Sequence, residues 1–334
     1  MGGMGQAAIC RTVEAYHNIP YDVFLLFTMR VFTWKNVQNL LRDLGCRSGD
    51  RHDLPTRTTF PDGAQYRVEI PSVEGPVALQ AVMEQARTLG VTVHRVSQGS
   101  GIMLLTDAEI REMGRLGNAA GAEVSLFVGP RAPWEGSAIP LTPDGKIFGW
   151  RHLGMDQLMY AFNDVERACE LGIRSILPAD EGLVWLVDQA RQRDLLPKDL
   201  IMKGSALLGA ANPIGIKLLQ EAGLNTINVA SDISLAKLAA LRQTISIPID
   251  LYIEGPDGLG GFTRYHELPE IVRVGAPIYL KFGLRNAPNI YPSGIHLENA
   301  AIQTGRERVR RAAIGMEHLA RGCGHRRPRR ARRD

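Results

Sequence analysis

Acidic and phenolic side chains alternate with apolar ones along a short segment in the last third of the chain. The apolar set is Ile249, Leu251 and Ile253, and the polar set is Asp250, Tyr252 and Glu254. Because successive side chains of a β-strand point to opposite faces, an extended segment places the three polar groups on one face. Two carboxylates and a phenol held together can exchange protons with a substrate, so the segment predicts a general acid–base site.

A lysine follows on the next apolar segment, which alternates in the same way. In residues 278–282, Lys281 shares the face that the polar residues occupy. If this segment is the neighbouring strand, Lys281 lies beside Glu254. A buried lysine amine whose pKa is lowered can form a Schiff base with a carbonyl substrate, and Lys203, at the end of an earlier apolar segment, shares this potential. The two lysines therefore join the two carboxylates as candidate catalytic residues.

Most of the other predicted strands also end in a charged or amide side chain. The candidates for substrate binding are Glu69, Arg95, Arg131, Asn228, Asp232 and Tyr252. Removing charges from water costs free energy unless they are paired, so a ring of mixed charge either pairs internally or holds a ligand. We expect a ligand, namely a small anionic or peptide-like substrate, partly because glycine-rich loops follow two of the strands, at residues 99–101 and 258–261.

The elements that must position these residues form a repeat. From Tyr66 onward, a short β-type segment, a loop and an amphipathic helical segment recur eight times. The predicted strands are 67–70, 91–96, 124–128, 175–177, 200–203, 226–230, 249–254 and 278–282. Eight such units over about 250 residues match a (β/α)₈ TIM-type barrel, an α/β fold whose active sites lie at the C-terminal ends of the strands. A doubly wound open sheet also alternates strands and helices, but normally has fewer strands and a phosphate-binding fingerprint.

Both ends of the chain fall outside the repeat. Residues 1–65 contain an expected amphipathic helix at 21–44 and a turn-rich linker, residues 66–320 form the barrel, and residues 321–334 are rich in arginine. The chain has a formal charge of +4, but its last fourteen residues contain seven arginines and one aspartate, which leaves −2 for the remainder. We expect a disordered basic tail, and the nearly neutral remainder gives no basis for a nucleic-acid-binding surface.

Cysteine and metal signals are weak. The chain has four cysteines, Cys10, Cys46, Cys169 and Cys323. They lack the short spacings of zinc and iron–sulfur sites, so we expect free thiols in a reducing compartment. A divalent metal would need distant ligands such as Asp250, Glu254 and His296, and we favour a site without metal.

Membrane signals are absent from the sequence pattern as well. The most apolar stretch, residues 23–29, is far shorter than a bilayer span, and the N-terminus has no secretory signal pattern. We therefore expect a cytoplasmic protein whose partner is a small-molecule or peptide substrate rather than a membrane. Self-association is common among barrel enzymes, so a homo-oligomer stays open.

The order of the motifs resembles that of a known family. The segment KGSALLGAANPIGIKLLQEAGLNTINVASDISLAKLAAL has a small-residue turn after a strand, then a helix, a second strand and the start of another helix. The next segment, IPIDLYIEGPDGLGG, has an acidic residue, an aromatic residue two positions later and a glycine three further, at Asp250, Tyr252 and Gly255. In this order the motifs resemble the collagenase-like peptidases (peptidase family U32) over residues 66–290.

This resemblance implies a barrel fold and a peptidase-like hydrolase, with one departure. After the signature glycine the family typically has a cysteine and further cysteines downstream, whereas this chain has Pro256, Asp257 and Gly258. In family members that modify RNA or assist hydroxylation of quinone precursors, those cysteines are thought to hold an iron–sulfur cluster. We therefore expect no iron–sulfur cluster here, and neither of those activities.

Three functions follow from the residues and the resemblance together. The leading expectation is a peptidase-like hydrolase that acts at the C-terminal rim of the barrel. Asp250 or Glu254 would act as the general base towards water, and Arg95, or one of the two lysines, would stabilise the oxyanion. The alternatives are a Schiff-base lyase or aldolase that uses Lys203 or Lys281, and a barrel that binds an anion without catalysis.

Overall fold

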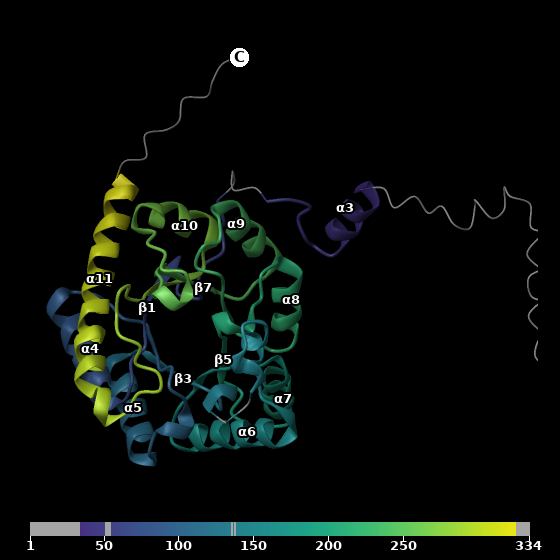
Figure 1. The fold of residues 1–334 in the computed structure, drawn as a ribbon. Helices are drawn as coiled ribbons and strands as arrows, with labels where there is room; N and C mark the ends of the chain where they lie inside the picture. The colour runs from purple at the N-terminus through teal and green to yellow at the C-terminus, as the bar shows by residue number, and fades with distance from the viewer. Residues whose placement is uncertain (1–33, 51–54, 135, 137, 325–334) are drawn as a thin grey trace, which may run out of the picture. The chain divides into compact units, whose positions relative to one another are not determined.

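Eight parallel strands close into a barrel with helices around it (Figure 1). The structure, a computed structural model, describes residues 34–50, 55–134, 136 and 138–324. The strands are β1 (Tyr66–Pro71), β2 (Arg95–Ser97), β3 (Glu123–Phe127), β4 (Ser175–Leu177), β5 (Ile201–Gly204), β6 (Thr226–Asn228), β7 (Ile249–Glu254) and β8 (Ile278–Phe282). Each strand pairs with its neighbours in chain order, and β8 closes the ring on β1. The predicted (β/α)₈ TIM-type barrel is confirmed.

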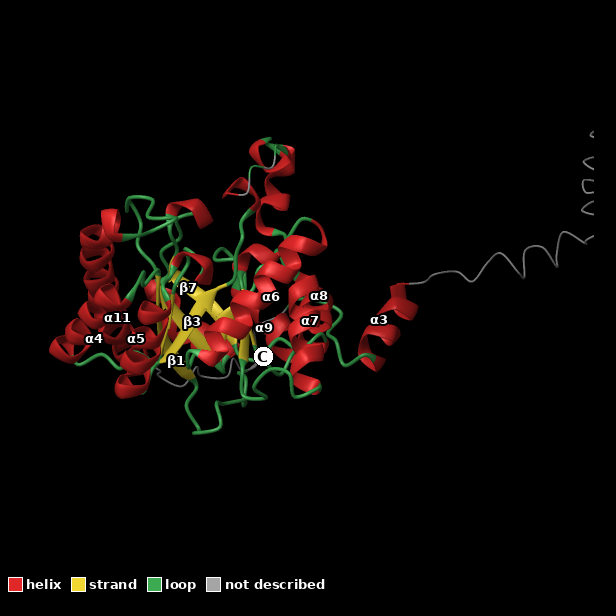
Figure 2. Cartoon of the chain, turned by 90° about the horizontal axis from the view of Figure 1, so that it is seen from below, coloured by secondary structure: helices red, strands yellow, loops and turns green. Residues whose placement is uncertain are grey.

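Helices connect the strands and enclose them, as Figure 2 shows from a second direction. They are α4 (Pro76–Leu89), α5 (Asp107–Ala120), α6 (Gly154–Glu170), α7 (Glu181–Gln192), α8 (Pro213–Glu221), α9 (Leu235–Thr244), α10 (Leu268–Gly275) and α11 (Glu298–Gly324). Helix α3 (Trp34–Asp43) belongs to a separate unit, residues 1–48. The helix ends follow sequence signals: Asp180 and Ser234 cap first turns, and Gly90 and Gly121 end α4 and α5 in the left-handed conformation.

Three strands have the predicted bounds, four differ from them by one or two residues, and β2 differs most. Strands β4, β7 and β8 have the predicted bounds, whereas the segment predicted at 91–96 pairs only from Arg95 to Ser97. His94 N donates to Val68 O at 2.9 Å, but in-register pairing with both β1 and β3 begins at Arg95. The strand is therefore shorter and lies further towards the C-terminal end than its apolar pattern indicates.

Two sets of strand side chains divide the interior. The outward set is apolar and fully buried beneath the helices: Ile70, Val96, Leu126, Ile176, Met202, Ile227, Leu251 and Leu280. The inward set fills the lumen and is mostly polar: Glu69, Arg95, Ser125, Ser175, Lys203, Thr226, Asp250 and Lys281. Burial of the outward apolar set stabilises the barrel. The inward set places charged and polar side chains in the lumen.

Residues 55–65, expected to belong to a linker, pack on the N-terminal end of the barrel. The hydroxyls of Thr56 and Thr58 donate to Ala276 O at 3.1 and 2.7 Å. Phe60 is 4% exposed, and its ring meets Tyr279 edge to face with centroids 5.2 Å apart. Residues 55–65 therefore cover this end of the lumen.

Helix α11 packs against α4 and α10 and continues to Gly324, past the residue where the basic tail is expected to begin. Residues 325–334, and the part of the expected 21–44 helix before residue 34, lie outside the described residues. In the part of the chain that the structure describes, no helix combines the length and apolarity needed to cross a bilayer.

Candidate functional site

A network of paired charges fills the lower part of the lumen, which is the part nearer the N-terminal ends of the strands. Arg95 on β2 is 1% exposed and lies at its centre. Its Nε is 2.8 Å from Glu123 Oε1, and its Nη1 is 3.2 Å from Asp250 Oδ1. Its guanidinium carbon lies 3.6 Å from the centroid of the Tyr279 ring. Asp250 also accepts a 2.7 Å hydrogen bond from Thr226 Oγ1. We call Arg95, Glu123, Thr226 and Asp250 the lower layer; in it each charge meets an opposite charge.

Glu69 on β1 links the lower layer to two lysines. Its Oε2 is 3.6 Å from Arg95 Nη1. Its Oε1 accepts hydrogen bonds from Ser97 Oγ, at 2.9 Å, and from Lys203 Nζ. The same Oε1 lies 3.4 Å from Lys281 Nζ. Two ammonium groups therefore share one carboxylate oxygen, which leaves positive charge in excess around them.

This arrangement shifts the pKa values of its members in opposite directions. Burial lowers the pKa of Lys203 to about 8; Glu69 opposes the shift and the nearby Lys281 adds to it. Burial alone would raise the pKa of Glu69, but Lys203 and Lys281 outweigh it and hold that pKa well below its usual range. Near neutral pH, Glu69 is ionised, and the Lys203 amine is close to losing its proton.

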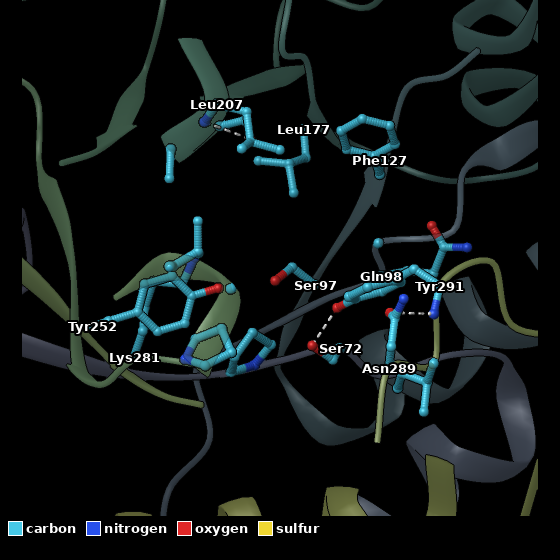
Figure 3. A pocket seen from close by; sticks show the side chains of 18 of the residues that line it. Ser72, Ser97, Gln98, Phe127, Leu177, Leu207, Tyr252, Lys281, Asn289 and Tyr291 are labelled. Carbon is cyan, nitrogen blue, oxygen red and sulfur yellow. Dashed lines mark hydrogen bonds between the residues drawn. The ribbon is translucent and has the colours of Figure 1, made fainter. Parts of the chain in front are cut away.

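A cavity of about 510 Å³ adjoins Lys281 at the C-terminal ends of the strands. Apolar and aromatic walls come from Phe127, Trp150, Leu177, Leu207, Leu259, Leu284 and Ile290. Figure 3 shows Lys281 and Tyr252 on one side of the cavity and Tyr291 on the other, with Ser97 and Ser72 between them. Lys203 is not a lining residue, so Lys281 is the strand lysine that reaches the cavity. The volume suits a small-molecule ligand.

Lys281 is held in place by neutral neighbours as well as by Glu69. Its Nζ donates to Asn228 Oδ1, and Asn228 Nδ2 in turn donates to Gly204 O at 2.7 Å, which fixes the amide orientation. The same Nζ lies 4.3 Å from the centroid of the Tyr252 ring. Burial raises the pKa of Tyr252 to about 12, so the phenol keeps its proton and can act as a hydrogen-bond donor.

Arg131, which follows β3, lines the cavity and is 9% exposed. Four aromatic rings surround its guanidinium carbon at 4.5 to 5.2 Å, those of Phe127, Trp134, Trp150 and Tyr291. Its Nη2 donates to Gly99 O, whereas its buried Nε has no hydrogen-bond partner among the described residues. Burial lowers the pKa of this guanidinium. Arg131 is thus a cation largely removed from water, and its Nε–H group is a hydrogen-bond donor without a partner among the described residues.

Arg308 on α11 is a second buried cation of the cavity wall. It is 5% exposed and donates from Nη1 to Ser72 O at 3.2 Å. Glu74 attracts both arginines without forming an ion pair with either one. Its oxygens accept hydrogen bonds from the N–H groups of Gly99 (2.7 Å) and Ser100 (3.1 Å). Within the described residues, no carboxylate lies within 4.0 Å of either guanidinium. We call Lys281, Arg131 and Arg308 the upper layer.

The structure brings most of the predicted site residues together, at two depths. Four line the cavity: Arg131, Asn228, Tyr252 and Lys281. Four lie beneath it in the lumen: Glu69, Arg95, Lys203 and Asp250. Asp232 is exposed in the loop after β6 and does not line the cavity.

Glu254 departs from its predicted position. A register shift between β7 and β8 pairs Glu254 with Phe282 instead of continuing the alternation, so its side chain leaves the lumen. Its Oε2 accepts a 2.6 Å hydrogen bond from Tyr265 OH and lies 3.7 Å from Arg311 Nε on α11. The prediction that Lys281 neighbours Glu254 is wrong, because the carboxylate beside Lys281 is that of Glu69.

Sequence reasoning missed several residues of the cavity wall, chiefly Arg308, Trp150 and Tyr291. Arg308 lies on a helix, Trp150 lies in the long β3–α6 connection, and Tyr291 lies in the loop after β8. None of them follows the period-two pattern that singled out the strand residues. The only available signal was position, since the segments after strand ends form the ligand-binding face of such barrels.

The three side chains considered as metal ligands do not converge. Asp250 belongs to the lower layer, Glu254 contacts α11, and His296 is exposed. Among the residues that the structure describes, no group of three or more His, Cys, Asp or Glu side chains could hold a metal ion.

Comparisons with known proteins show that this chain is similar to other proteins in fold alone. No protein-family model and no curated protein sequence matches the chain. A U32 peptidase structure is similar with 12% identity and a TM-score of 0.41, covering 70% of this chain and 98% of the other. A prophage protein of the dihydrodipicolinic acid synthase family from E. coli, in complex with pyruvate, has 15% identity and a TM-score of 0.41, covering 77% and 78%.

Oxaloacetate acetylhydrolase, in complex with oxalate, is similar to the same degree, with 11% identity, a TM-score of 0.43 and coverage of 79% and 95%. These values describe proteins that share a barrel. The resemblance to the collagenase-like peptidases is therefore supported only as a likeness in fold.

Proposed function

We propose that this protein is a lyase of the aldolase type, which acts on a small anionic carbonyl compound through a Schiff base on Lys281. The carrying observation is that Lys281 lines the cavity while sharing the one carboxylate beside it with Lys203. Schiff-base formation needs an amine as nucleophile, and Lys281 is the strand lysine that lines the cavity. Its neighbour on the same carboxylate, Lys203, has a pKa that burial lowers to about 8, so a proton-accepting amine lies beside it.

The proposed reaction balances with residues of this chain and water. The Lys281 amine adds its lone pair to the carbonyl carbon, and the oxygen leaves as water after taking up protons, for which the Tyr252 phenol is an adjacent donor. The cationic imine accepts the electron pair of the bond between the α and β carbons, and the departing fragment becomes a carbonyl compound as the hydroxyl on the β carbon loses a proton. The enamine takes up a proton, and water hydrolyses the imine to restore the amine.

The positions of Asp250 and Glu254 favour this chemistry over the peptidase-like hydrolase that would use one of them as its general base. A general base must come within hydrogen-bond reach of the water it activates. Asp250 is committed to Arg95 and Thr226 below the cavity, and Glu254 lies outside the lumen. The amine, the phenol and the cationic wall all line the cavity, whereas these two carboxylates do not.

Borohydride trapping tests the proposal directly. Wild-type protein is incubated with pyruvate, reduced, digested and mapped by mass spectrometry. We expect the adduct on Lys281 and a drop of about 100-fold or more in Lys281→Met, because no other cavity amine replaces it. Lys237→Met, which removes an exposed lysine of α9, is the matched control and should trap as the wild type does.

Two outcomes would contradict the proposal. If pyruvate, larger 2-oxo acids and aldehydes all leave Lys281 unmodified while calorimetry shows saturable binding, the protein is an anion-binding barrel. If a peptide substrate is cleaved, and Asp250→Asn and Glu254→Gln each abolish cleavage in folded protein, the hydrolase is correct.

A further inference from the structure

We propose that the substrate carries a second anionic group, a carboxylate or a phosphate, which binds to Arg131 and Arg308 across the cavity from Lys281. The cavity would then select dianionic carbonyl compounds over monoanionic ones. The carbonyl half of this statement rests on the function proposed above, and the anion-binding half rests on the two arginines alone.

Arg131 has the properties of a built anion site. It is more than nine-tenths buried, it lines the cavity, and its Nε lacks a hydrogen-bond partner among the described residues. The four surrounding rings hold the guanidinium plane without using its N–H groups. A buried cation without a paired anion is costly, and a planar guanidinium fits a carboxylate or phosphate with two parallel hydrogen bonds.

Arg308 strengthens the same end of the cavity. Its Nε is also buried without a hydrogen-bond partner in the described part of the chain, and its Nη1 is anchored on Ser72 O. Ser72 Oγ accepts from Tyr291 OH, and the Tyr291 ring lies 5.2 Å from the Arg131 guanidinium carbon. Arg131 therefore lies against the Tyr291 ring and Arg308 is linked to the Tyr291 hydroxyl through Ser72, so an anionic group beside Tyr291 would meet two positive charges.

The two ends of the cavity are separate. Figure 3 places Lys281 and Tyr252 on the opposite side from Tyr291, with Ser72 and Ser97 between them. A carbonyl carbon bonded to Lys281 therefore leaves the Tyr291 side free for a distal group. A cavity of about 510 Å³ has room for the few carbon atoms that would connect the two ends.

The test compares a probe that has no distal anion with two that have one. Borohydride trapping is titrated with pyruvate, with 2-oxoglutarate, which adds a distal carboxylate to the same 2-oxo acid group, and with dihydroxyacetone phosphate, whose phosphate is its only anionic group. For the better of the two distal-anion probes we expect half-saturation about 30-fold below that of pyruvate, and Arg131→Gln should reduce this preference to less than about threefold. Arg308→Gln should reduce it in part, and Arg131→Lys should restore part of it.

Arg310→Gln is the matched control, since Arg310 lies on α11 beside Arg308 but is exposed and paired with Glu307. It should keep the wild-type preference. If wild-type protein traps all three probes equally and Arg131→Gln changes nothing, the second anion site does not exist, whereas the Schiff base stands.

Calorimetry with glutarate and with butyrate separates this proposal from the Schiff-base chemistry, because neither compound has a carbonyl that can form an imine. Glutarate binding that exceeds butyrate binding and is lost in Arg131→Gln supports the anion site even where no adduct forms. Equal binding of the two compounds, or glutarate binding that is indifferent to Arg131, overturns it.

Discussion

The lower and upper layers of the barrel interior both contain buried arginines, but in the described part of the chain these are paired with carboxylates only in the lower layer. In the lower layer, Arg95 is surrounded by Glu123 and Asp250, and Glu69 approaches from above. In the upper layer, Arg131 and Arg308 are buried to a similar degree but have no carboxylate within 4.0 Å among the described residues. No residue of the lower layer lines the cavity of about 510 Å³, whereas all three residues of the upper layer do.

This difference separates a structural charge network from a binding site. Buried charges that pair with one another gain Coulomb energy that offsets their desolvation, so removing one partner destabilises the fold. Arg131 and Arg308, which face an open cavity, lack this compensation until an anion arrives. We therefore expect substitutions in the lower layer to change stability and those in the upper layer to change ligand binding.

The largest expected effect on stability is that of Asp250→Asn. The substitution keeps the side-chain shape and the contact with Thr226, but it removes a charge next to the fully buried Arg95. We expect a loss of about 3 kcal/mol in the free energy of unfolding, measured by urea denaturation. Asp257→Asn is the matched control, because that ion pair with Arg285 is half-exposed and screened by water, so its loss should change the free energy of unfolding far less.

A small effect of Asp250→Asn, equal to that of Asp257→Asn, would contradict the proposed difference between the lower and upper layers. It would mean that the lower layer is screened by water and is not a sealed network. Loss of trapping on Lys281 in a variant that stays folded would instead move Asp250 into the chemistry.

A smaller effect is expected from the pH dependence of stability. The pKa of Lys203 is about 8 in the folded protein and 10.5 in the unfolded chain, so between these values the unfolded state binds a proton that the folded state does not. The free energy of unfolding therefore rises with pH in this window, by about 2 kcal/mol from pH 7.5 to 9.5.

Urea denaturation across that range, in the wild type and in Lys203→Met, measures this contribution. The variant should lose the rise, because methionine does not titrate. A wild-type stability that stays flat or falls between pH 7.5 and 9.5, with no difference from the variant, would show that Lys203 keeps its proton beside Glu69.

The fold could be predicted because its signal is repeated. Alternating apolar segments, helix caps and terminal glycines recur in each unit, so an error in one unit, such as the bounds of β2, leaves the architecture unchanged. Residues 55–65 lacked such a signal, because Phe60 reads as one apolar residue among turn formers and its contact with Tyr279 spans most of the chain.

The site could be predicted only where the strand period continued. Asp250, Tyr252 and Lys281 face inward as period two requires, but the bulge before Glu254 turns that side chain outward, and no local composition marks it. The partnership of Lys203 with Glu69 joins strands that are far apart in sequence, so the charge balance that distinguishes the two layers became visible only in three dimensions.

The smallest expected effect on stability is that of Arg131→Gln, and it sharpens the comparison most. Its matched counterpart is Arg95→Gln, which removes another buried arginine and leaves Asp250 and Glu123 without their cation, at a cost of about 3 kcal/mol. At Arg131, relief of desolvation offsets the lost contacts with aromatic rings, so we expect a change below about 1 kcal/mol in either direction. Urea denaturation of the two variants at pH 7 measures the contrast. A loss at Arg131 as large as that at Arg95 would assign both arginines to the fold, and the cationic cavity wall would then need no ligand to explain it.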